Sequence, residues 1–131
     1  PHIHFNLSHS GDLALCALSD RPVGVDIERV RPHRAGLPRY ALSDREYRWF
    51  LAQGGGWELF CRLWTRKESW VKRTGGSIAG PSGICPPLPG EQAEGVLLDD
   101  FSGAGWRAAV CAAGAPAWKL LWRDHAEAYK T

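Results

Sequence analysis

The stretch from Val23 to Glu28, with the sequence VGVDIE, constrains this chain most, because apolar residues alternate along it with glycine and two acids. A period of two is typical of a strand with one apolar and one polar face. Asp26 and Glu28 would leave the same face, roughly 7 Å apart along the strand. Two such carboxylates repel each other, and burial would raise the pKa of each. A bound cation relieves both costs, and oxygen ligands with retained waters suit Mg²⁺. The alternative is an edge strand with two solvated carboxylates.

The longest helical pattern runs from Trp57 to Thr74, where apolar residues recur at helical spacing and Gly75 follows as a stop signal. Glu68 and Lys72 are four residues apart, so they lie on one flank of this helix. An ordinary surface ion pair between them is the simplest interpretation, and it is worth a few tenths of a kcal/mol.

A shared metal site is the alternative to that surface pair. If the helix packs on the acidic strand, Glu68 joins Asp26 and Glu28, and three carboxylates with water make a reasonable Mg²⁺ shell. Lys67 falls on the apolar stripe of the same helix. We expect its flexible stem to carry the ammonium out to solvent. The other possibility is a carboxylate or phosphate partner, because an unpaired buried ammonium is costly.

The tripeptide Ser8-His9-Ser10, just before Gly11, is a candidate anion-binding cluster. Two hydroxyls, an imidazole and free turn amides suit an anion. Neighbours on a strand point to opposite faces, so Ser8 and His9 are not expected to form a nucleophile–base pair. The sequence also lacks the G-x-S-x-G pattern of a nucleophile elbow. A polar turn without a ligand is the plain alternative.

The remaining patterns complete an α+β chain. Ser43 and Glu46 predict a capping box at the start of a short helix. Residues 77–95 are rich in Gly and Pro and are expected to be irregular, and 123–130 predict a frayed helix. The expected strands, of which the first three would form a meander, are residues 2–7, 12–18, 23–28, 95–98, 106–112 and 118–122.

Composition bounds the partners and the compartment. A chain of 131 residues predicts one compact domain. The net charge of +2 is too small to indicate nucleic acid, but it suits an acidic partner or a phosphorylated ligand. No apolar run reaches the length of a membrane span, and four cysteines without a C-x-x-C pair predict reduced thiols in a cytoplasmic protein. The chain starts with Pro1 and contains no Met, so we expect a piece of a longer protein.

Three segments taken together resemble one family. The sequences FNLSHS at 5–10, VGVDIE at 23–28 and WTRKESWVK at 64–72 are similar, in order and spacing, to motifs of the 4'-phosphopantetheinyl transferases of the two-lobed, surfactin-synthetase-activating type. The resemblance implies an α+β fold in which residues 1–22 are the closing strands of a first lobe. Residues 23–131 would form the second lobe, an antiparallel sheet packed on a long helix. Most of the first lobe would be missing.

The function implied by the resemblance is Mg²⁺-dependent transfer of 4'-phosphopantetheine. Coenzyme A would be the donor, a serine of an apo acyl or peptidyl carrier protein the acceptor, and 3',5'-ADP the leaving group. The resemblance implies the metal ligands Asp26, Glu28 and Glu68, the coenzyme A contacts Ser8, His9 and Lys72, and the catalytic residues Glu68, Lys72 and Glu46. Glu68 ranks above Glu46 as the general base.

Two other functions and one physical property remain as expectations. The chain could be an incomplete fragment that only binds coenzyme A or carrier protein, or a different Mg²⁺-dependent phosphohydrolase. A chain without its first lobe would expose an unpaired edge and an apolar face. We therefore expect self-association through residues 3–18.

Overall fold

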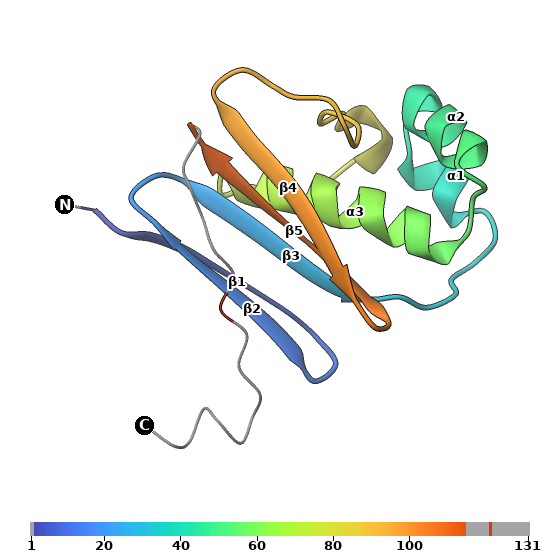
Figure 1. The fold of residues 1–131 in the computed structure, drawn as a ribbon. Helices are drawn as coiled ribbons and strands as arrows, with labels where there is room; N and C mark the ends of the chain where they lie inside the picture. Colours follow the sequence, from blue (N-terminus) through green and yellow to red (C-terminus); the bar gives the residue numbers. More distant parts are fainter. Residues whose placement is uncertain (1, 115–120, 122–131) are drawn as a thin grey trace.

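The computed structural model describes residues 2–114 and 121, which form an α+β fold (Figure 1). One antiparallel sheet contains β1 (His4–Ser10) and β2 (Leu13–Ser19). The other has the strand order β3 (Val23–Arg29), β5 (Trp106–Ala113), β4 (Val96–Gly103). The helices are α1 (Leu37–Ala41), α2 (Asp44–Ala52) and α3 (Trp57–Lys72), with a short 3-10 helix η1 (Pro81–Gly83). The expected fold class is confirmed.

The acidic strand β3 does not continue the opening hairpin as a meander, so that expectation is wrong. β1 and β2 pair only with each other, whereas β3 pairs antiparallel with β5. Pro22, just before β3, has no N–H to donate, and its carbonyl accepts a hydrogen bond from Ala113 of β5 at 3.0 Å. The short turn keeps β2 and β3 near each other in space, but the pairing partner of β3 comes from the far end of the described chain.

Most other elements lie where their patterns place them. The capping box is present: Ser43 Oγ accepts from the Glu46 N–H at 3.1 Å, and Glu46 Oε1 accepts from the Ser43 N–H at 2.8 Å. Helix α1 is only five residues long and contains Pro38. Pro38 nevertheless sits in the first turn, where its missing N–H costs nothing. Apart from residue 121, the predicted strand 118–122 and the predicted helix 123–130 lie outside the described residues.

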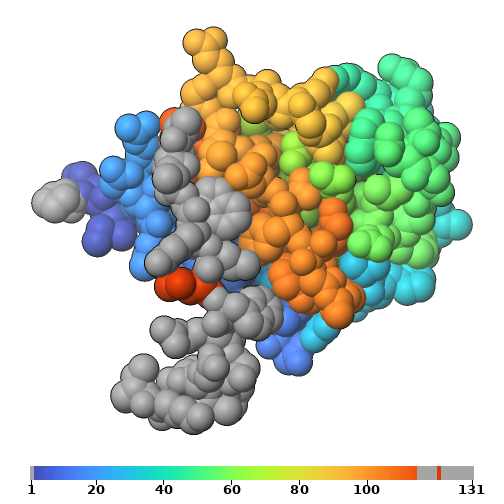
Figure 2. All heavy atoms as spheres, viewed as in Figure 1, coloured from blue at the N-terminus to red at the C-terminus, as the bar shows by residue number. Residues whose placement is uncertain are grey.

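Helix α3 lies across the sheet, with α1 and α2 at one end and the β1–β2 hairpin beyond β3 (Figure 1). Figure 2 shows one face of the molecule, where β4 separates the blue hairpin from the green helical layer. The core consists of two apolar clusters. One joins the helices through Ala41, Leu42, Phe50, Phe60, Leu63 and Leu88. The other joins the sheet to β2 through Val23, Val25, Val110 and Ala112, with Leu15 and Ala17 of β2 packed on it.

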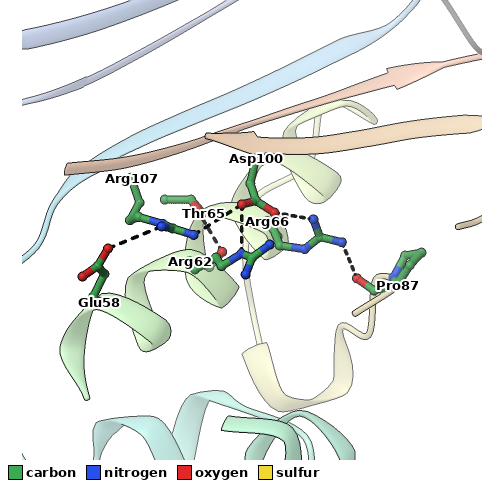
Figure 3. Close-up of polar contacts among 7 residues, drawn as sticks. All are labelled: Glu58, Arg62, Thr65, Arg66, Pro87, Asp100 and Arg107. Atoms are coloured by element: carbon green, nitrogen blue, oxygen red, sulfur yellow. Dashed lines mark hydrogen bonds and ion pairs between the residues drawn. The ribbon is translucent and has the colours of Figure 1, made fainter. Parts of the chain in front are cut away.

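A buried charge cluster fastens α3 to the sheet on the flank seen in Figure 3. Asp100 of β4 accepts hydrogen bonds from Arg62 at 2.9 Å and from Arg66 at 2.7 Å, both on α3. Arg107 of β5 adds a longer contact of 3.4 Å, and Arg66 also donates to the Pro87 carbonyl at 2.8 Å. One carboxylate thus ties the helix, two strands and the loop before β4 together.

The four cysteines, Cys16, Cys61, Cys85 and Cys111, are free thiols, as their spacing predicts. Across residues 2–114 and 121, no helix has the length and apolar character needed to cross a membrane.

Candidate functional site

The last turn of α3 packs against β3 at Gly24. A Cβ atom at Gly24 would lie 2.2 Å from the Ser69 carbonyl oxygen and 2.3 Å from the Arg73 backbone nitrogen. Contacts this short do not occur between unbonded atoms, so the helix can approach the strand only because residue 24 has no side chain. This close approach sets Glu68 and Lys72 beside the acidic face of β3.

The three predicted metal ligands influence one another. Asp26 is 5% exposed, and burial raises its pKa to about 8, with the charges of Glu28 and Glu68 adding to the shift. Burial also raises the pKa of Glu28, although the neighbouring Asp26 carboxyl and the Arg31 charge partly offset it. The pKa of Glu68 is raised by burial and by Glu28, against the pull of Lys72. The strand and the helix therefore hold three carboxylates within electrostatic reach of one another.

The donor atoms fit a hard divalent cation by their chemistry. Asp26 Oδ2 is buried and has no hydrogen-bond partner among the described residues. Such an atom is costly to bury, and a cation would satisfy it. All three groups offer carboxylate oxygens, which Mg²⁺ prefers. Among the described residues, no three His, Cys, Asp or Glu side chains are close enough together to enclose a metal ion. The three carboxyl groups are therefore neighbours on β3 and α3 without forming an enclosed ligand set in the described residues.

Ser8 and His9 lie on opposite sides of the hairpin, as strand alternation predicts. Ser8 is 8% exposed, and its hydroxyl donates to Asp26 Oδ1 at 3.1 Å while it accepts from the Ile27 N–H at 3.0 Å. His9 is exposed. The structure therefore brings Ser8 to the acidic strand and leaves His9 on the outer surface of β1.

Lys72 spans the gap between the hairpin and β3. Its ammonium donates to the Val25 carbonyl at 2.8 Å and to the Leu7 carbonyl at 3.1 Å. An ammonium has three N–H donors, so these two carbonyls engage two of them. Its charge lowers the pKa of Asp26, opposing the larger effect of burial. Lys72 is therefore fixed in place next to the carboxylates.

Glu46 faces Lys67 instead of the acidic strand. Glu46 Oε1 lies 2.7 Å from Lys67 Nζ, which also donates to the carbonyls of Ala41 at 2.7 Å and Pro81 at 2.6 Å. Lys67 is 0% exposed, so the expectation that it reaches solvent is wrong. Its three acceptors come from α1, α2 and η1, and a pattern read along one helix cannot reveal them.

A hollow of about 240 Å³ adjoins the site at Glu28. The strand and helix patterns do not predict this hollow, although the recurrence of aromatic residues along α3 is a usable signal. Its walls combine aromatic rings with Arg29, the last residue of β3, and Arg31, which follows that strand. The lining residues are Glu28, Arg29, Arg31, His33, Leu37, Trp57, Phe60, Cys61 and Trp64.

Comparison with known proteins adds an independent observation. Residues 22–111 match the family model described as the 4'-phosphopantetheinyl transferase superfamily. The chain is 41% identical over 81 residues to the 4'-phosphopantetheinyl transferase psf-1 of Bacillus pumilus, covering 60% of this chain and 35% of that protein. It is 36% identical over 83 residues to Sfp of Bacillus subtilis, covering 62% and 37%. It is 45% identical over 78 residues to AcpT of Salmonella typhimurium, covering 56% and 41%. Each match thus spans well under half of the relative.

Proposed function

Because this chain belongs to the 4'-phosphopantetheinyl transferase superfamily, we propose that it transfers 4'-phosphopantetheine from coenzyme A to a serine of an apo acyl or peptidyl carrier protein. The observation that carries the proposal is the grouping of Asp26, Glu28 and Glu68 with Lys72 at the contact between β3 and α3. The names of the relatives point to the same reaction.

Asp26, Glu28 and Glu68 are the proposed Mg²⁺ ligands. The buried Oδ2 atom of Asp26 and the raised pKa values of all three groups support this assignment. When bound, Mg²⁺ would neutralise charge on the pyrophosphate of coenzyme A.

The proposed transfer moves one group and one proton. The serine hydroxyl of the carrier attacks the β-phosphorus of coenzyme A, the bond to the 3',5'-ADP oxygen breaks, and 3',5'-ADP leaves. The hydroxyl proton passes to a carboxylate, and Glu68 is the proposed base because burial raises its pKa toward neutrality. Lys72 directs its third N–H to the phosphates and stabilises the charge that develops on the leaving group. Glu46 is proposed to contribute only indirectly: its ion pair with Lys67 anchors the part of α3 that also carries Glu68.

The proposed substrate contacts lie on two sides of the acidic residues, at the β1–β2 hairpin and at the hollow beside Glu28. His9, exposed on the outer surface of β1, is proposed to contact a phosphate of the nucleoside, whereas Ser8, buried against β3, is proposed to act beside the phosphates through its hydrogen bond to Asp26. The aromatic hollow beside Glu28 suits the uncharged pantetheine arm, because its walls are largely apolar, with Arg29 and Arg31 among the lining residues.

The test is a transfer assay with the 131-residue chain, labelled coenzyme A, Mg²⁺ and an apo carrier protein. We expect label on the carrier serine, none after chelation of the metal, and a loss of at least about a hundredfold with Glu68→Gln. Glu58→Gln, which changes an exposed acid on the same helix, is the matched control and should retain transfer. Circular dichroism checks that each variant is folded.

Two results would contradict the proposal. Binding of coenzyme A without any transfer would support the binding-only alternative. Release of free phosphate without modification of the carrier would support a phosphohydrolase.

A further inference from the structure

The edge of β3 that faces away from β5 is capped by side chains of β1. Successive residues of a strand direct their N–H groups to opposite edges, and β5 pairs with only one of them. The N–H groups of Val25, Ile27 and Arg29 lie on the other edge, where an unpaired donor would be costly once buried. No strand pairs with this edge in the described part of the chain.

Three polar side chains of β1 accept hydrogen bonds from these N–H groups. The Val25 N–H donates to Asn6 Oδ1 at 2.8 Å, the Ile27 N–H to Ser8 Oγ at 3.0 Å, and the Arg29 N–H to Ser10 Oγ at 3.0 Å. Each bond joins residues 19 apart in the sequence, so β1 and β3 run parallel in a constant register. We call these three bonds the polar ladder.

The middle rung of the polar ladder has a second contact. Ser8 Oγ accepts from Ile27 and donates its own proton to Asp26 Oδ1 at 3.1 Å. A hydroxyl has one donor and two acceptor positions, so both contacts are compatible. With Ser8 at one oxygen, Asp26 presents the other, Oδ2, without a partner among the described residues.

Lys72 adds a fourth link between β1 and β3. Its ammonium donates to the carbonyls of Leu7 and Val25, one on each strand. The hairpin is therefore held to β3 by a charged side chain as well as by the polar ladder.

We propose that the polar ladder docks β1 on β3, and that Ser8 is a positioning residue which orients Asp26 for metal binding. The inference deepens the proposed function and rests on its assignment of Asp26 as a metal ligand. It makes the opening hairpin part of the metal site, although the match to the family model begins only at residue 22.

The test is calorimetric titration of the 131-residue chain with Mg²⁺ alone, without coenzyme A. Hydrogen bonds to charged groups are among the stronger ones, so we expect Ser8→Ala to weaken Mg²⁺ binding about tenfold. Ser8→Thr keeps the hydroxyl and should retain the wild-type affinity. Ser10→Ala is the matched control: it removes a rung that does not contact Asp26, so it should lower the melting temperature without changing the affinity.

Amide hydrogen exchange supplies a second readout that needs no metal. Ser8→Ala should speed exchange at the Ile27 N–H, and Ser10→Ala should speed it at the Arg29 N–H, because each N–H loses its acceptor. Ser8→Cys, with a weak S–H donor of nearly the same size, replaces Ser8→Ala in both experiments if the latter fails to fold.

The outcomes separate the inference from the proposed function. If the wild-type chain binds Mg²⁺ and Ser8→Ala binds it equally well, the positioning role of Ser8 is overturned and the metal site stands. If the wild-type chain binds no Mg²⁺, both are overturned. Unchanged exchange at Ile27 and Arg29 in the two variants would overturn the polar ladder itself.

Discussion

Asp26 illustrates what burial and neighbouring charge do to one carboxylate. It accepts a hydrogen bond from Ser8 and is influenced by the charges of Glu28 and Glu68, and its pKa of about 8 means that it keeps its proton at neutral pH when no cation is bound. The sequence predicts that the acids share a face, because strand parity is a local property. It does not predict Ser8 as a partner of Asp26, since that contact depends on how a second sheet docks on β3.

A pH dependence of stability follows from Asp26. Its pKa is about 8 in the folded chain and near the usual value of 3.8 when unfolded, so the folded state binds the extra proton between these values. Stability of the metal-free chain should therefore fall as pH rises from about 4 to about 8, where the proton is lost. Calorimetric melting in a chelator measures this, and Asp26→Asn should flatten most of the slope. A slope that is the same in Asp26→Asn would assign the effect to other groups.

Lys67 is a second residue whose effect on stability depends on its burial and on its ion pair with Glu46. Replacing it with Met leaves the buried Glu46 carboxylate without its cation, so Lys67→Met should lower the free energy of unfolding by about 3–5 kcal/mol. The double variant Lys67→Met/Glu46→Gln should recover part of this loss. Arg45→Met, which breaks an exposed ion pair with Glu91, should cost no more than about 1 kcal/mol. Urea unfolding measures all three, and equal losses for Lys67→Met and Arg45→Met would contradict the buried pair.

At the scale of elements, α3 contributes Phe60 and Leu63 to the helical cluster of the core and carries half of the candidate site. Its pattern predicts its length and the flank shared by Glu68 and Lys72, because both are properties of one helix. The predicted meander was wrong because strand pairing is not a property of one segment. It depends on contacts between distant parts of the chain, and the pattern of β3 is equally compatible with pairing to β2 and to β5.

Gly24 tests how closely α3 must approach β3. The Cβ of Gly24→Ala would collide with the backbone of Ser69 and Arg73, which cannot rotate away. We expect a loss of about 3 kcal/mol in the free energy of unfolding and weaker Mg²⁺ binding, because Glu68 moves with the helix.

Gly36→Ala is the matched control for Gly24→Ala, since Gly36 has open space around it and an ordinary backbone conformation. It should leave both stability and Mg²⁺ affinity near the wild-type values. Chemical unfolding and metal titration of the two variants would refute the close-packing argument if their effects were alike.

At the scale of the whole molecule, the hairpin divides its residues between two very different faces. Its inner face carries the polar ladder and packs Leu15 and Ala17 on the core. Its outer face exposes large apolar side chains: Ile3 is 74%, Phe5 65%, Leu7 60% and Leu18 73% exposed. The division of the chain into two lobes after residue 22 stays a prediction. The contacts of the inner face show that the hairpin also contributes to the fold of the residues after 22.

The apolar outer face predicts self-association of the chain. Phe5 and Leu18 lie opposite each other in the register of β1 and β2, so they are neighbours on this face. We expect concentration-dependent association in sedimentation experiments, and Phe5→Thr with Leu18→Thr should shift it toward monomer. Leu51→Ser, which alters an exposed leucine on α2, should leave it unchanged. A wild-type chain that stays monomeric at all concentrations would contradict this.

An amine-reactive reagent would meet the lysines of this chain very unequally. Such reagents attack the neutral, accessible amine, whereas Lys67 is 0% exposed and its ammonium is held by three oxygen acceptors from α1, α2 and η1. Acylation at Lys67 therefore requires these segments to separate from α3. The rate at which a mass spectrometer finds Lys67 labelled would report how often the helical layer opens, with no probe other than the native side chain.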